Sequence, residues 1–210
     1  MPTPTEILRS LLANRRLYRT SDLVQEGVDR ITLARAARAG EAMQYVRGIY
    51  AGSSVTLESG AAFAALSLAR PGAVVCLLSA AQHHGLSDED PSKIWMAVDR
   101  ARGKAVIPGG PGLPVQTVWW QGKDMSVGVE TVSIAGVDVL VTNRARTVVD
   151  LIRMRAKLGD EPAMKSLRDY IEADGDVGAL WTTAEDLGRG QAIEPFVRAA
   201  EEFRGSMARR

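Results

Sequence analysis

Cysteine is almost absent from this chain of 210 residues, which has a single one, Cys76, in the apolar run of residues 73–78. A lone buried thiol excludes a disulfide framework and is typical of proteins in a reducing compartment. The chain also lacks an apolar run of about 18 residues, the length that a membrane helix needs. Its first residues do not resemble a signal peptide. We therefore expect a cytoplasmic protein without membrane contacts.

Groups that carry chemistry are equally scarce. The two histidines, His83 and His84, are neighbours, so on a helix they point in different directions and do not form a chelating pair. No acid lies at metal-ligand spacing from them or from Cys76. The chain contains no glycine-rich phosphate loop, no Gly-x-Ser-x-Gly motif and no two-histidine metal helix. We expect no catalytic residues, no metal site and no cofactor.

Charge is distributed unevenly along the chain, although the net charge is only +1. Residues 1–52 contain eight arginines, no lysine and five acids, an excess of three positive charges that leaves −2 for the remainder. A basic segment joined to a slightly acidic one suggests that only the first meets an anionic polymer. A solvated basic face without a partner is the alternative.

Three short helices and a hairpin are expected in residues 1–52. The first helix begins at Thr3, where Glu6 completes a capping box and Pro4 suits the first helical position. A helix at residues 22–26 ends at Gly27, and a third, at residues 30–39, ends at Gly40. These are followed by two strands, which flank Arg47-Gly48 and are expected at residues 42–46 and 49–51. The order predicts a winged helix-turn-helix domain.

The third helix is the predicted reading element. Leu33, Ala36 and Ala37 share one side, whereas Arg35, Arg38, Thr32 and Ile31 point to the other. Arginine is the usual reader of guanine edges in the major groove, and threonine contacts a base or a thymine methyl group. Arg30 falls nearer the buried side, but a long side chain in the first turn still reaches outward.

Residues that flank this helix are candidates for phosphate contacts. Arg19 precedes the second helix and Arg47 lies at the hairpin tip. The amides at Thr20 and Ser21, at the start of the second helix, are further candidates. Any one arginine is explained well enough as an exposed surface residue, but as a set their positions agree with one docking geometry.

Residues 53–210 are predicted to form a mixed α/β domain with a helical C-terminal third, which makes the fold class α+β. Apolar runs, separated by glycine-containing turns, predict the helices and strands of this part. The helices are expected at 57–68, 73–84, 143–158, 161–173, 183–187 and 193–207, and the strands at 93–98, 115–120, 129–134 and 137–142.

Two pairs of side chains stand out in this second part. Trp119 and Trp120 are adjacent in a predicted strand, so they face opposite sides. One ring is expected to be buried and the other exposed, as a candidate contact for a protein partner. Arg146 and Asp150 lie four residues apart on a predicted helix, and we favour a structural ion pair over a catalytic carboxylate.

Several landmarks resemble the AbiEi-type antitoxin family of abortive-infection toxin–antitoxin systems. They are the residues Arg47-Gly48-Ile49-Tyr50-Ala51, Leu78-Ser79-Ala80-Ala81, His84-Gly85-Leu86 and Arg146-Thr147-Val148-Val149-Asp150-Leu151. The resemblance spans residues 20–151. It implies an antitoxin that binds operator DNA, represses its own operon and counteracts a nucleotidyltransferase-like toxin. It provides no residue map for contact with the toxin.

Two other functions remain open. One is a ligand-sensing transcription factor whose second domain holds a small molecule. The other is a nuclease fused to a winged helix, which needs clustered acids and a lysine to hold a divalent ion. The predicted strands carry Asp99, Glu130 and Asp138 but no acid-x-lysine pair.

Overall fold

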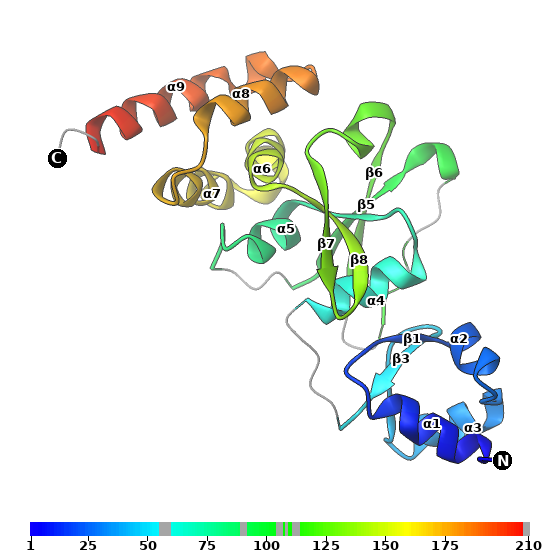
Figure 1. The fold of residues 1–210 in the computed structure, drawn as a ribbon. Coiled ribbons are helices and arrows are strands. Elements are labelled where there is room, and N and C mark those ends of the chain that lie inside the picture. The colour runs from blue at the N-terminus through cyan, green and yellow to red at the C-terminus, as the bar shows by residue number, and fades with distance from the viewer. Residues whose placement is uncertain (55–59, 89–91, 104–106, 108, 111–113, 208–210) are drawn as a thin grey trace. The chain divides into compact units, whose positions relative to one another are not determined.

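The computed structural model describes residues 1–54, 60–88, 92–103, 107, 109–110 and 114–207. It has a mixed α+β fold of helices and two sheets (Figure 1). The chain forms two compact units. The first comprises residues 1–72, 106–115 and 131–139, and the second comprises residues 73–105, 116–130 and 140–210. Among the described residues, no helix has the length and apolarity needed to cross a membrane.

The first unit begins with three helices, α1 (Pro4–Leu12), α2 (Thr20–Gln25) and α3 (Arg30–Arg38). The predicted capping box of α1 is confirmed, since the Glu6 amide donates to the Thr3 hydroxyl and the Thr3 amide donates to the Glu6 carboxylate. Leu8 and Leu12 of α1 pack with Leu23 of α2 and Leu33 of α3 in one apolar cluster.

The two ends of α3 are defined by local hydrogen bonds. Asp29 caps its start, accepting from the Thr32 amide at 2.8 Å. At its other end the Glu41 amide donates to the Ala36 carbonyl and the Gly40 amide to the Ala37 carbonyl. This is the Schellman pattern, and it requires a left-handed residue at Gly40, whose φ is +74°. The predicted end of this helix at Gly40 is therefore confirmed.

A three-stranded antiparallel sheet completes the first part of this unit. Its strands are β1 (Tyr18–Arg19), β2 (Ala42–Val46) and β3 (Ile49–Gly52), in the order β1-β3-β2. The helix α4 (Ala61–Ala69) packs against β2 and β3. The compact unit thus extends beyond the predicted domain of residues 1–52.

The second sheet has five strands in the order β6-β5-β4-β8-β7. They are β4 (Val74–Val75), β5 (Ile94–Asp99), β6 (Val115–Trp120), β7 (Val129–Ile134) and β8 (Val137–Thr142). The short central strand β4 pairs parallel with β8 and antiparallel with β5. The predicted helix at residues 73–84 was therefore wrong at its start, because Val74 and Val75 are strand residues and α5 spans only Leu77–His83.

Helices cover the second unit from Arg144 to the end of the described chain, as predicted for the C-terminal third. They are α6 (Arg144–Leu158), α7 (Asp160–Glu172), α8 (Val177–Asp186) and α9 (Gly190–Met207), and two 3-10 turns, η1 (Arg100–Arg102) and η2 (Gly122–Met125), lie in the preceding loops. The buried helix α6 packs against α5, α7, α8 and α9. The core of this unit therefore forms around α6.

Candidate functional site

An exposed stripe of side chains runs along α3. Ile31, Ala34, Arg35 and Arg38 are all exposed, and they follow the i, i+3, i+4, i+7 spacing of one helix face. Leu33, on the opposite side, is 4% exposed within the apolar cluster. The core contacts therefore orient the helix, and the predicted division of its faces is confirmed for Arg35, Arg38 and Leu33.

The arginines of this unit fall into two groups, those with local partners and those without. Arg9 pairs with Glu41 at 3.3 Å, and the Arg16 guanidinium lies 4.9 Å from the centre of the Tyr18 ring. In contrast, five exposed arginines make no side-chain hydrogen bond or ion pair with the described residues: Arg15, Arg30, Arg35, Arg38 and Arg47. All of these except Arg15 are among the eight predicted DNA contacts.

Arg30 and Arg47 occupy the two places where they were expected to reach outward. Arg30 is exposed in the first turn of α3, although its angle on the helix had suggested a position nearer the core. Arg47 is exposed in the turn between β2 and β3, next to Gly48, whose φ is +82°. A positively charged side chain at a hairpin tip is free to meet an anionic partner.

Thr32 is engaged within the protein. Its amide and its hydroxyl each donate to the Asp29 carboxylate at 2.8 Å. These bonds lower the pKa of Asp29, with the amide as the larger contributor. Thr32 therefore stabilises the start of α3 with its hydroxyl, and contact with a base would require that bond to be exchanged.

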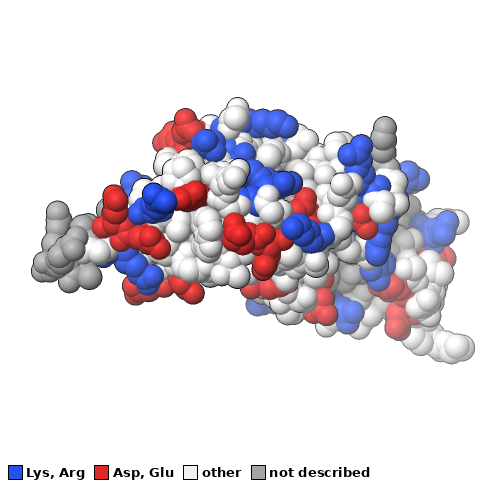
Figure 2. Space-filling model, turned by 90° about the horizontal axis from the view of Figure 1, so that it is seen from above, with Lys and Arg blue, Asp and Glu red and all other residues white. Residues whose placement is uncertain are grey.

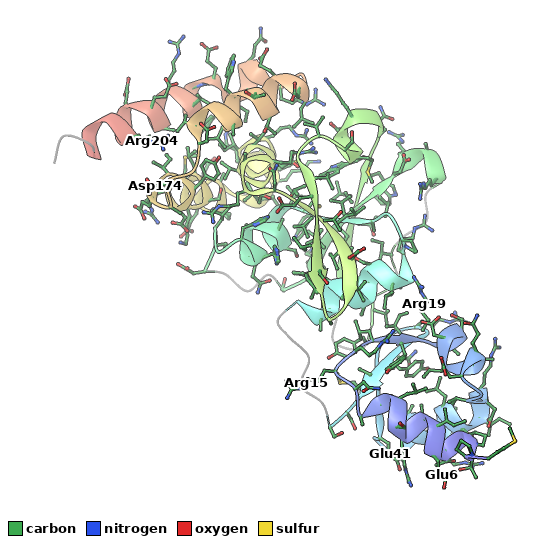
Figure 3. The ribbon with its side chains drawn as sticks, in the orientation of Figure 1. Glu6, Arg15, Arg19, Glu41, Asp174 and Arg204 are labelled. Carbon is green, nitrogen blue, oxygen red and sulfur yellow. The ribbon has the colours of Figure 1, made fainter. Side chains whose placement is uncertain are left out.

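Arg19, Thr20 and Ser21, which were predicted to contact DNA phosphates, instead make hydrogen bonds within the protein. The half-buried Arg19 donates from Nε and one terminal nitrogen to the Leu68 carbonyl at 3.4 Å (Figure 3). Thr20 gives both its amide and its hydroxyl to the Gly48 carbonyl. Ser21 donates to the Asp22 carboxylate, which adds a negative charge to this helix start.

Ile31 was assigned to the outward face from the sequence but was not selected as a site residue. Its side chain is 70% exposed in the first turn of α3, on the same stripe as Arg35 and Arg38. The sequence alone places this apolar residue on the outward face beside the arginines, so it could have been selected as a candidate contact residue.

The two adjacent tryptophans of β6 have different environments, as predicted. Trp119 is 46% exposed, whereas Trp120 is 4% exposed. The guanidinium of Arg146 lies 4.5 Å from the centre of the Trp120 ring. Trp120 is therefore the ring that was expected to be buried, so of the two candidates for a partner contact, Trp119 and Trp120, only Trp119 has an accessible ring, and its contact with a partner stays a prediction.

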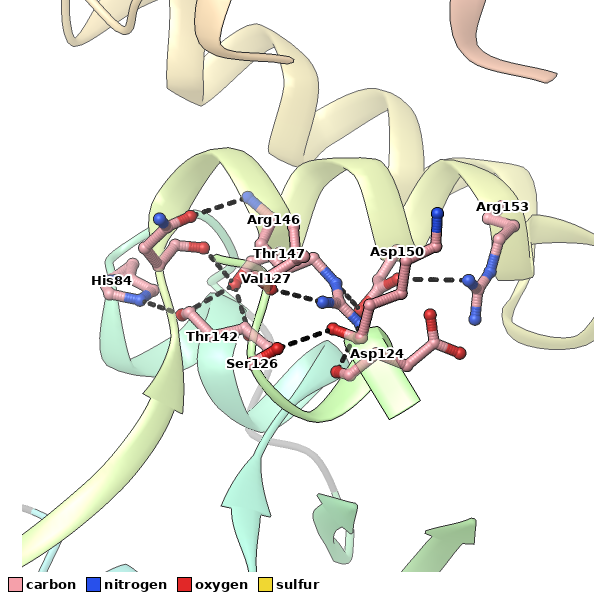
Figure 4. Close-up of polar contacts among 11 residues, drawn as sticks. His84, Asp124, Ser126, Val127, Thr142, Arg146, Thr147, Asp150 and Arg153 are labelled. Carbon is pink, nitrogen blue, oxygen red and sulfur yellow. Dashed lines mark hydrogen bonds and ion pairs between the residues drawn. The ribbon is translucent and has the colours of Figure 1, made fainter. Parts of the chain in front are cut away.

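A buried ion pair lies within α6, and its arginine also donates hydrogen bonds to the chain before β7 (Figure 4). Arg146, with no exposed surface, donates from Nε to Asp150 at 2.8 Å, and its terminal nitrogens donate to the carbonyls of Val127 and Asp124. Gly128 lies against Arg146, and a Cβ at this glycine would come within 2.6 Å of the arginine Cβ. The predicted structural ion pair is confirmed.

His84 also has a packing partner. Its Nε2 lies 2.7 Å from the Thr142 carbonyl at the end of β8, so the neutral ring donates this hydrogen bond. Burial lowers the pKa of His84 and keeps the ring neutral. Across the described residues, no group of three His, Cys, Asp or Glu side chains is placed to hold a metal ion.

The second unit carries its surface charges differently from α3. Basic and acidic side chains are interspersed on the face that Figure 2 presents. Several pair along a helix, such as Lys165 with Asp169 and Arg198 with Glu194, both at 2.6 Å. An apolar groove of about 190 Å³ lies between α7 and α9, lined by Met164, Leu167, Arg168, Ile171, Ala199 and Ala200. This volume is below the roughly 300–1,000 Å³ of drug-sized ligand sites.

Comparisons with known proteins identify a similar fold. The chain matches no family model and no curated protein. Among solved structures it is similar to the crystal structure of the RV2827C protein from Mycobacterium tuberculosis, with 16% identity and a TM-score of 0.52. The match covers 90% of this chain and 78% of that chain. At this identity the similarity concerns the fold alone.

Proposed function

We propose that this protein is a transcriptional regulator that binds double-stranded DNA through a winged helix-turn-helix in residues 1–52. One observation carries the proposal: α3 exposes Arg35 and Arg38 without local partners, on the face opposite Leu33. Several basic residues of the second unit, such as Lys165 and Arg198, pair with acids on the same helix, whereas no acid lies on this stripe.

The arrangement around α3 supports the same function. The helix follows α2 after a turn at Gly27, whose φ is +90°, and is followed by the β2–β3 hairpin. In a helix-turn-helix protein the second helix of the motif enters the major groove. We assign base reading to Arg35 and Arg38, and contacts with DNA phosphates to Arg30 and Arg47. The internal hydrogen bonds of Arg19 and Thr20 give those residues a structural role.

The regulator is further proposed to be the antitoxin of a toxin–antitoxin operon, with its own operator as the DNA and a nucleotidyltransferase-like toxin as the counteracted partner. This part rests on the resemblance to the AbiEi-type family. Co-expression with the product of the neighbouring gene tests it, and rescue of growth by the full chain is the expected result. Unchanged toxicity would remove the antitoxin role and leave the DNA-binding proposal standing.

The first experiment measures binding of the full chain to a duplex from its own promoter by fluorescence anisotropy across a salt series. Selective binding over a scrambled duplex is expected, weakening steeply as salt rises. Arg35→Ala should weaken the free energy of DNA binding by about 1–3 kcal/mol and relax specificity at one base pair. Arg198→Ala on α9 is the matched control, since it removes the same charge from a side chain that is 74% exposed. Equal affinity and selectivity of Arg35→Ala and the wild type would refute the assignment.

A further inference from the structure

Ile31 has the most exposed large apolar side chain of α3. It is 70% exposed, compared with 46% for Val24 on α2. Its partners on the helix face are Ala34 at i+3, Arg35 at i+4 and Arg38 at i+7. Isolated apolar residues are common on protein surfaces, but this one lies in line with the unpaired arginines. Any surface that binds Arg35 and Arg38 along this stripe therefore also meets Ile31.

The major groove offers one apolar group at the base edges, the C5 methyl group of thymine. Ile31 carries a β-branched side chain without polar atoms, so it recognises a base edge only by burying such a group. The small Ala34 beside it leaves room for the helix to approach the bases. We propose that Ile31 reads a thymine methyl group, and that the DNA target of this protein contains a thymine near the guanine contacted by Arg35, at the spacing derived below.

Helix and duplex geometry give the spacing. Residues four apart are separated by about 6 Å along a helix axis, at 1.5 Å per residue. Base pairs follow at about 3.4 Å along one strand. The thymine is therefore expected about two base pairs from the guanine read by Arg35, on the side of the N-terminus of α3.

This inference rests on the proposed function, and the experiment separates the two. The full chain is used to select duplexes from a randomised pool that contains unmethylated cytosine, so thymine is the only source of the methyl group. The thymine that the selected duplexes share is then replaced by uracil, which keeps every hydrogen-bonding atom and removes only the methyl group. Wild-type affinity should fall about fourfold, because burying one such carbon contributes about 0.8 kcal/mol and 1.4 kcal/mol is a factor of ten.

The variant Ile31→Ala should bind the thymine and uracil duplexes with equal affinity and keep the salt dependence of the wild type. Alanine favours helix at this position, so α3 is expected to stay folded, which circular dichroism checks. Val24→Ala is the matched control, since it shortens another exposed β-branched side chain of the same unit, and it should retain the fourfold preference for thymine.

The outcomes distinguish failure of the DNA-binding proposal from failure of the role assigned to Ile31. Absence of any enriched sequence would refute the DNA-binding proposal itself. Enrichment with equal wild-type affinity for the thymine and uracil duplexes would overturn the role of Ile31 and leave the role of the arginines standing. A fourfold preference that persists in Ile31→Ala would also overturn it, because another side chain would then contact the methyl group.

Discussion

Replacing Arg146 by methionine should strongly destabilise the second unit. The substitution removes the charge and keeps a long apolar side chain next to Trp120. It leaves Asp150, which is 0% exposed, without its partner at 2.8 Å. The nearest remaining cation, Arg153, has its Nη1 3.8 Å from Asp150 Oδ1, and neither of these atoms has a hydrogen-bond partner among the described residues.

The size of the effect follows from this burial. Removing one partner of a buried ion pair costs about 3–5 kcal/mol, because the other charge remains uncompensated. The carbonyls of Val127 and Asp124 lose their donors as well. Since domains are stable by about 5–15 kcal/mol, Arg146→Met should bring the second unit close to unfolding.

The effect should depend on pH in a defined direction. Burial raises the pKa of Asp150, and Arg146 is the main group that opposes this. In Arg146→Met the folded-state pKa rises further above its unfolded value. The stability deficit is then fully present above the folded pKa and disappears as pH falls below the unfolded value of about 4.

Tryptophan fluorescence gives a selective assay, because all four tryptophans, Trp95, Trp119, Trp120 and Trp181, belong to the second unit. Urea unfolding is followed for the wild type, Arg146→Met, Asp150→Leu and the double variant. The double variant should recover most of the loss, since a buried pair is replaced by apolar side chains. A loss under 1 kcal/mol in Arg146→Met, or a loss independent of pH, would refute this account of the pair.

The remaining predictions concern a helix end and a buried histidine. Gly40→Ala should lower the free energy of unfolding by about 1–2 kcal/mol, because φ is +74° there, although a Cβ would meet no atom within 4 Å. Thermal unfolding followed by circular dichroism measures this loss, and an unchanged midpoint would contradict the backbone strain. His84 has a pKa lowered by burial from 6.5, so its contribution to stability is complete above pH 6.5 and is lost as pH falls through the folded pKa. His84→Gln should reduce the difference in urea midpoint between pH 7.5 and 5.5, and an identical difference in both proteins would argue against this.

The parts of the fold that were predictable are those set by short-range interactions. A capping box needs only Thr3 and Glu6, and a helix end needs only a glycine that tolerates positive φ, as at Gly40 and Gly85. The orientation of α3 was equally accessible, since the position of Leu33 on the helix defines which side is buried. Each of these signals lies within one or two helical turns.

Long-range interactions account for the errors. Val74 and Val75 were assigned to a helix because a strand of two residues shows no alternation, and only pairing with β5 and β8 makes them strand. Only Cys76 lies between that strand and α5, whose first residue, Leu77, has a φ of +52°. Within the candidate site, Arg19 bonds to a carbonyl 49 residues away. Local patterns carry no information on such a contact, so an engaged arginine was indistinguishable from a free one.

The structure also separates the two kinds of residue on which the resemblance rests. Arg146, Thr147 and Asp150 are buried, and their side chains make hydrogen bonds within the protein at the start of α6. Residues without exposed surface contribute to the fold and cannot themselves contact a toxin or DNA. Arg47, which belongs to another of the resembling motifs, is exposed at its hairpin. Under the proposed function, contacts that distinguish partners are therefore to be sought among exposed side chains, with α3 and Arg47 as the candidates for DNA and Trp119 as the candidate for a protein partner.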